Sequence, residues 1–168
     1  RHGGAFAPYR QSERKAIYRQ YAEQLVQAGY AYYAFDTPEV LDAKRKEIQN
    51  FQYSHLHREH MHNSLVLDAA MVRQLLQENT PHVIRIKMPV NEEIIFTDMI
   101  RGEVVFHSGQ VDDKVLLKAD GMPTYHLAVV VDDYFMKISH AFRGEEWLPS
   151  APVHILLWKY LFGLENMP

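Results

Sequence analysis

The sequence predicts an α/β protein in which part of a doubly wound sheet is interrupted by an inserted α+β region. Residues 137–163 indicate a strand followed by a helix, and the segment before them fits a further helix. Helix, strand and helix in this order form half of a doubly wound sheet. Between residues 82 and 117 the apolar period changes to two, which indicates a small, largely antiparallel sheet inside the insertion.

The chain begins with an amphipathic helix. Ser12 followed by Glu13 is typical of a helix start, and Gly29 ends the pattern. The apolar residues at three- and four-residue spacing are Ile17, Tyr18, Tyr21, Ala22 and Leu25. The aromatic-rich residues 30–35 then indicate a short strand.

Two further helices follow before the predicted sheet. Thr37 supplies a capping hydroxyl before Pro38 at the first helical position, so a helix is expected to about Ile48. Asp68 caps a short helix that carries Met71, Val72, Leu75 and Leu76.

The predicted sheet has four short strands, at residues 83–86, 94–96, 104–106 and 115–117. They are separated by turn residues at Asn91, Arg101–Gly102, Gly109 and Asp112–Asp113. With the preceding helices they form the α+β insertion, which the turn at residues 120–123 closes.

The secondary structure of the segment at residues 127–136 is ambiguous. Residues 129–131 are three valines, which favour a strand, yet the apolar positions between 127 and 136 also fit a helical face. Lys137 to Phe142 indicates a buried strand, and a final helix runs from the prolines at 149 and 152 to Gly163. Residues 143–147 would then lie beyond the carboxyl end of a strand, where doubly wound folds bind ligands.

Composition excludes several classes of protein. The 168 residues are 47% hydrophobic, but no run approaches the roughly 20 apolar residues of a membrane span, so we expect a cytoplasmic protein. The absence of cysteine excludes disulfides and thiolate zinc sites. A net charge of −3 argues against nucleic acid as a partner unless Lys and Arg are concentrated locally.

Four histidines lie within eight residues, at His55, His57, His60 and His62. Their spacing places no more than a pair on one face of a helix or strand, and no carboxylate completes an obvious ligand set. We therefore predict no metal site and leave the role of the cluster open.

Several motifs together resemble one family. They are APYRQSER at residues 7–14, AYYAFDTP at 31–38, Pro-Thr-Tyr at 123–125, Asp-Asp at 132–133 and Arg-Gly-Glu-Glu-Trp at 143–147. In this order they resemble the glutamyl-tRNA synthetases, which are class I enzymes, over nearly the whole chain. The HIGH-type and KMSKS-type motifs of that family do not occur, so the resemblance implies an internal segment of a longer enzyme that is inactive alone.

The resemblance also implies a domain division. Residues 1–30 and 124–168 would belong to a Rossmann-type nucleotide-binding domain, and residues 31–123 to the inserted connective-peptide domain that binds the tRNA acceptor stem. It favours a helix rather than a strand after Tyr125. Some relatives carry a Cys-x-Cys pair where this chain has residues 34–36, so no structural zinc is implied.

The resemblance assigns substrate contacts by position. Arg143 and Tyr125 match residues that contact glutamate, and Arg143 offers a planar fork that suits a carboxylate. Val129 stands where the family usually has an asparagine, so one polar contact in the pocket is missing or replaced. Glu146 and Trp147 match positions near the adenosine of ATP.

The other charged candidates are basic residues. Arg10, Arg85, Lys87 and Arg101 are candidate tRNA contacts, Arg101 within the motif at residues 98–102. A helix-capping and packing role is at least an equal alternative for Arg10. We assign no catalytic residue: His126 and His140 are interpreted as structural or pocket-wall residues, and neither Asp132 nor Asp133 receives a catalytic role.

The implied function is that of a glutamate–tRNA ligase. The longer enzyme, a monomer, would use ATP with Mg²⁺ to activate L-glutamate and pass it to the 3′ end of its tRNA. The alternatives are a glutaminyl-tRNA synthetase, the paralogue that glutamylates a modified tRNA base, and an RNA-binding module without catalytic ancestry.

Overall fold

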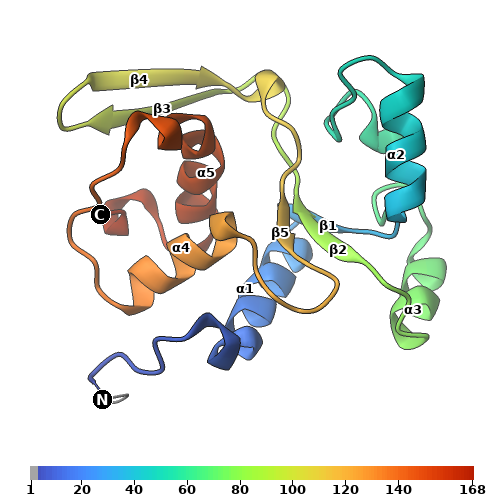
Figure 1. Cartoon of the computed structure of the whole chain (residues 1–168), viewed down its shortest axis with the longest axis horizontal. Coiled ribbons are helices and arrows are strands. Elements are labelled where there is room, and N and C mark those ends of the chain that lie inside the picture. The colour runs from blue at the N-terminus through green and yellow to red at the C-terminus, as the bar shows by residue number, and fades with distance from the viewer. Residues whose placement is uncertain (1–3) are drawn as a thin grey trace.

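The computed structural model describes residues 4–168. Its α-helices are α1 (Lys15–Gln27), α2 (Pro38–Glu47), α3 (Ala69–Gln77), α4 (Tyr125–Phe135) and α5 (Ala151–Leu161). Its strands are β1 (Ala31–Ala34), β2 (Val83–Ile86), β3 (Glu93–Asp98), β4 (Gly102–His107) and β5 (Val115–Leu117). Figure 1 shows a central sheet with α2 and α3 on one side and α4, α5 and the β3–β4 hairpin on the other. The class of fold and the positions of these strands agree with the prediction. The four strands expected in one sheet are divided, however: β2 and β5 belong to a sheet with β1, and β3 and β4 form a separate two-stranded sheet.

The central sheet is antiparallel, in the order β1-β2-β5, and it separates two apolar cores. Successive side chains of a strand point to opposite faces. Ala31 accordingly packs in the main core, whereas Tyr32 and Ala34 pack in a second core with Tyr53 and Met61. Because both faces are buried, β1 shows no alternation of apolar and polar residues in the sequence.

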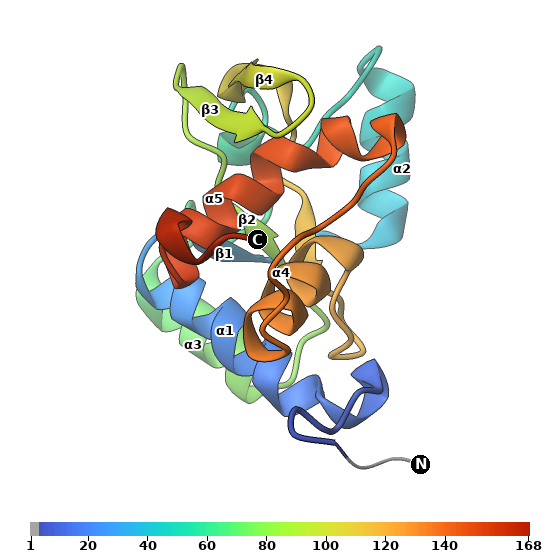
Figure 2. The ribbon, with the colours of Figure 1, turned by 90° about the vertical axis from the view of Figure 1, so that its left-hand side faces the viewer.

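The main core joins segments from all parts of the chain. It contains buried residues of α1, β2, β5, α4 and α5, and it extends to Ile94 and Phe96 of the hairpin. Helix α5 lies between the β3–β4 hairpin and the helices α1 and α4 (Figure 2). The division at residues 30 and 123 stays a prediction, and this shared core crosses both boundaries.

Helix capping agrees with the prediction in two of three cases. The Thr37 hydroxyl accepts a hydrogen bond from the Val40 N–H, and the Asp68 carboxylate accepts from the N–H groups of Ala70 and Met71. Ser12 does not begin α1. It lies in the 3₁₀ helix η1 (Gln11–Glu13), which precedes the helix.

The predicted buried strand at Lys137 to Phe142 is wrong. Lys137 adopts a left-handed conformation, with φ of 56°, and ends α4. The following residues form no strand, and Phe142 is 89% exposed. A strand requires a neighbour for its N–H and C=O groups, and within residues 4–168 no strand pairs with this segment. The segment is therefore a loop between α4 and α5.

In the described part of the chain, no helix has the length and apolar character needed to cross a membrane.

Candidate functional site

A cavity of about 590 Å³ lies where the tip of the β3–β4 hairpin, α4, the loop after α4 and α5 meet. Its wall is mainly apolar, with Phe96, Val130, Ile155 and Trp158 from the main core. A concave, mostly apolar site with a few polar groups is the usual form of a small-molecule pocket. The polar side chains in its wall are those of Thr97, Asp98, Arg101, Asp133, His140, Arg143, Glu145, Trp147 and His154.

Arg143 lines this cavity from the loop after α4. Its Nη2 donates to Oδ2 of Asp133 at 3.2 Å, and its side chain is 29% exposed. Asp133 is on α4, one turn after Val129, which also lines the cavity. Burial raises the pKa of Asp133, and Arg143 opposes that effect. A single carboxylate contact leaves other N–H groups of the guanidinium able to meet a second anion.

Trp147 forms another part of the wall, in the 3₁₀ helix η4 (Glu145–Ser150). Its ring meets Phe96 edge to face, with centroids 6.2 Å apart. Its Nε1 donates to Nδ1 of His154 at 3.1 Å. The indole is therefore fixed both by packing and by a hydrogen bond.

Tyr125 and Glu146 are not in the cavity wall. Tyr125 opens α4 with about half of its surface exposed, and its ring packs against His154 at a centroid distance of 5.3 Å. Glu146 is exposed beside Trp147. The structure thus brings Arg143, Val129 and Trp147 together around one cavity and places the other two predicted residues next to it.

The predicted tRNA contacts do not share one surface environment. Arg101 lines the cavity at the hairpin tip and pairs with Glu145, whereas Arg10 is exposed and Lys87 is half-buried. Arg85 is 9% exposed, donates to the carbonyl oxygen of Asp113 and lies over the ring of Tyr53 at 4.1 Å. This burial argues against a phosphate contact, and we withdraw Arg85 as a candidate.

The remaining titratable candidates have structural partners. Asp132 accepts hydrogen bonds from Arg14 and Tyr18, which join α4 to α1. His140 lines the cavity, and His126 contacts His154. Among residues 4–168 no group of three His, Cys, Asp or Glu side chains could hold a metal ion.

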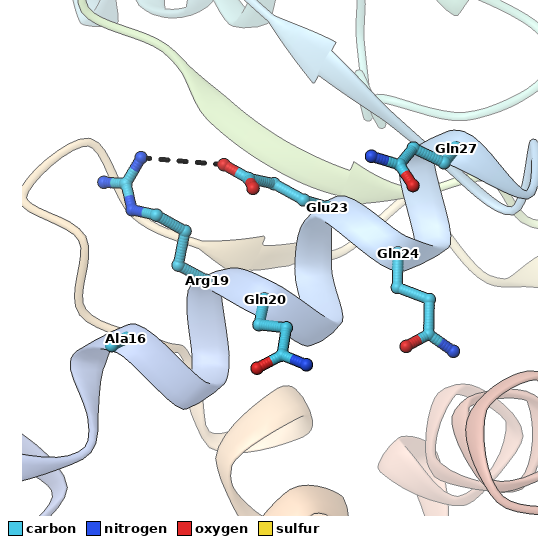
Figure 3. Close-up of a pocket in the computed structure, with 6 residues that line it drawn as sticks. All are labelled: Ala16, Arg19, Gln20, Glu23, Gln24 and Gln27. Carbon is cyan, nitrogen blue, oxygen red and sulfur yellow. Dashed lines mark ion pairs between the residues drawn. The ribbon is translucent and has the colours of Figure 1, made fainter.

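A second hollow, of about 430 Å³, lies on the solvent side of α1 and is lined by Ala16, Arg19, Gln20, Glu23, Gln24 and Gln27. Figure 3 shows these residues, all polar except Ala16, along one helix, with Arg19 and Glu23 paired. It contains none of the predicted site residues.

Sequence reasoning did not identify Asp133 and His154 as the partners of Arg143 and Trp147. Asp133 was considered without its partner, because the loop that brings Arg143 to it was interpreted as a strand. His154 was not considered, although a lone histidine within the apolar run of α5 was a signal that it needs a buried hydrogen-bond partner.

The comparisons with known proteins define the class. Residues 4–166 match the family of class I tRNA synthetases for glutamate and glutamine (E and Q), catalytic domain, so the chain belongs to this family.

Within the family, the chain is similar to glutamate–tRNA ligases. It is 57% identical to the enzyme of Amoebophilus asiaticus and 54% identical to that of Cytophaga hutchinsonii, over 99% of this chain in both cases. A glutamate tRNA ligase from Elizabethkingia meningosepticum, solved in complex with its amino acid, superposes with a TM-score of 0.90 at 51% identity over 95% of this chain. The chain spans about a third, 33%, of each of these relatives.

Proposed function

We propose that this chain is the part of a glutamate–tRNA ligase that carries the amino-acid pocket and the acceptor-stem region. The supporting observation is Arg143, whose guanidinium lines the cavity with one carboxylate partner, beside Val129 and Trp147. A guanidinium can donate two parallel hydrogen bonds to a carboxylate. It therefore favours glutamate over glutamine, whose side-chain amide offers one oxygen and a competing N–H donor.

The proposed reaction has two steps. A carboxylate oxygen of glutamate attacks the α-phosphate of ATP, which forms glutamyl-adenylate and releases pyrophosphate. A hydroxyl of the terminal adenosine of the tRNA then attacks the activated carbonyl and releases AMP. Such a reaction depends mainly on orientation and on stabilisation of developing charge.

The residues of this chain act in binding and orientation. Arg143 would hold the side-chain carboxylate of glutamate, with Tyr125 beside it, and Trp147 with Glu146 would border the adenosine. Arg10, Lys87 and Arg101 would contact the acceptor stem. ATP would bring Mg²⁺ through its phosphates, as is usual for this ion, since residues 4–168 contain no three-ligand group. The tRNA substrate also implies that the full-length enzyme works in the cytoplasm, and we expect a monomer.

An RNA-binding module without catalysis is the weaker alternative. It would need concentrated positive charge, but the net charge is −3 and one of the candidate phosphate contacts, Arg85, is buried.

The test is pyrophosphate exchange by the full-length enzyme, with glutamate and glutamine compared in the presence and absence of tRNA. We expect exchange that requires glutamate and tRNA. The variant Arg143→Lys keeps the charge but loses the planar fork, and should raise the KM for glutamate by about tenfold or more. Exchange supported equally by glutamine, or a lysine variant with unchanged KM, would refute the assignment of Arg143.

A further inference from the structure

His154 is a buried residue that contacts Trp147, His126 and Tyr125. It lies on α5, is 4% exposed and lines the cavity. One ring nitrogen meets Nε1 of Trp147 at 3.1 Å, and the other meets Nδ1 of His126 at 3.1 Å. The ring of Tyr125 packs against the same imidazole.

The geometry fixes the tautomers of both histidines. An indole N–H can only donate, so Nδ1 of His154 is the acceptor and carries no proton. The proton of neutral His154 is then on Nε2, which donates to Nδ1 of His126. His126 in turn carries its proton on Nε2. The hydrogen bonds therefore run in one direction, from Trp147 through His154 to His126.

Protonation of His154 would break this arrangement, because an imidazolium has no acceptor to offer Trp147. The surroundings oppose it. Burial, with His126 and Arg143 adding to its effect, lowers the pKa of His154 to about 3. Burial and Lys114 also lower the pKa of His126, while Asp112 opposes them.

We infer that His154 is a positioning residue of the site, which holds the indole of Trp147 and the ring of Tyr125 in the geometry that the substrates meet. The expected effect of His154 on the kinetics rests on the proposed function. The hydrogen bonds from Trp147 through His154 to His126 are independent of that function. His154 is 4% exposed at the cavity wall, and its contacts with Trp147 and Tyr125 carry the proposed effect on the substrates.

The first test uses the chain of 168 residues and the ¹⁵N chemical shifts of its imidazole nitrogens. His154 should show an unprotonated Nδ1 and a protonated Nε2 at neutral pH, and the Trp147 indole N–H should exchange slowly with water. The variant Trp158→Phe assigns the indole signal, since the chain has only two tryptophans. A protonated Nδ1 on His154 would overturn the inference whatever the enzyme does.

The second test is kinetic and uses the full-length enzyme. His154→Asn keeps an acceptor near the position of Nδ1, whereas His154→Gln places its amide near Nε2 and leaves the indole without an acceptor. The glutamine variant should raise the KM for ATP by about tenfold with little change in kcat, and the asparagine variant should stay within about threefold of the wild type.

Equal effects of the two variants, or an unchanged KM for ATP in the glutamine variant, would overturn the positioning role. If the wild-type enzyme shows no glutamate-dependent exchange, the proposed function fails, and the chemical shifts still decide whether the hydrogen-bond chain exists.

Discussion

The chain contains two Asp–Asp pairs, at residues 112–113 and 132–133, and the structure uses them in different ways. Asp113 is fully buried and accepts hydrogen bonds from Tyr32 at 2.6 Å, Met88 N–H at 3.0 Å and Arg58 at 3.2 Å. Asp133 lies at the cavity wall with Arg143 as its ion-pair partner.

The two carboxylates differ in how fully their oxygens are paired with donors inside the protein. Asp113 has donors on both oxygens, and its main-chain groups bond to Tyr53 and Arg85, so it fastens the second core to the central sheet. Asp133 holds one side of a guanidinium that still faces a cavity. At the structural site, both carboxylate oxygens of Asp113 have hydrogen-bond donors inside the protein. At the candidate binding site, the guanidinium of Arg143 has N–H groups that its one carboxylate partner, Asp133, does not occupy.

The largest expected effect comes from removing the charge of Asp113. In Asp113→Asn the amide NH₂ must face a donor at whichever oxygen it replaces, and Arg58 is left buried without a counter-charge. We expect a loss of about 3 to 5 kcal/mol in the free energy of unfolding. The matched variant Asp133→Asn should lose about 1 kcal/mol or less, because its pair is partly exposed. Urea denaturation of the 168-residue chain measures both.

A double variant tests whether the loss of stability in Asp113→Asn comes from the unpaired buried charge of Arg58. Arg58→Met combined with Asp113→Leu removes both charges and should be more stable than Asp113→Asn, because no unpaired ion remains. Equal losses in the two asparagine variants would contradict the distinction between the two carboxylates.

A smaller effect is expected from His154, on the way the free energy of unfolding depends on pH. His154 has a pKa of about 3 in the folded chain and about 6.5 when unfolded. Between these values the unfolded chain binds the extra proton, so this residue's contribution to stability is complete above the unfolded pKa and falls as the pH is lowered. From about pH 7 to about pH 5 the loss is about 2 kcal/mol.

The comparison variant for this prediction is His154→Asn, which does not titrate. The titratable group His126 and the charged group Arg143 face His154, and both remain in the variant. Stability curves of the two proteins, measured by urea denaturation at several pH values, should therefore converge as the pH falls. Parallel curves would mean that His154 is protonated in the folded chain.

Much of the fold was predictable because its signals are local. The Thr37 and Asp68 caps, the helical spacing in α1 and the alternation in β3 and β4 each depend on neighbouring residues. The segment at Lys137 to Phe142 was not, because a strand is defined by its partner and no local pattern reports one. The burial of Arg85 was also hidden, since it depends on Tyr53, which is distant in sequence.

The candidate site was predictable only in part. Arg143, Val129 and Trp147 came from the family resemblance, and the structure places them around one cavity. The partners that orient Arg143 and Trp147, namely Asp133 and His154, are ten and seven residues away along the chain. Their contacts arise from the packing of α4, η4 and α5, which periodicity alone does not specify.

The smallest expected effect concerns Val129, where the resemblance implies an asparagine and this chain has an apolar side chain. Val129 packs against the main core and lines the cavity on the face of α4 that carries Asp133. Val129→Asn should cost about 1 kcal/mol of stability. It also adds an N–H donor, which should lower the KM for glutamate in the full-length enzyme by about threefold to tenfold.

The control variant Val129→Ala removes the same packing without adding a donor, so it should share the loss of stability and not the gain in affinity. If the asparagine variant binds glutamate no better than the alanine variant, another residue already supplies the missing polar contact, and incomplete pairing of Arg143 is sufficient for recognition of the carboxylate.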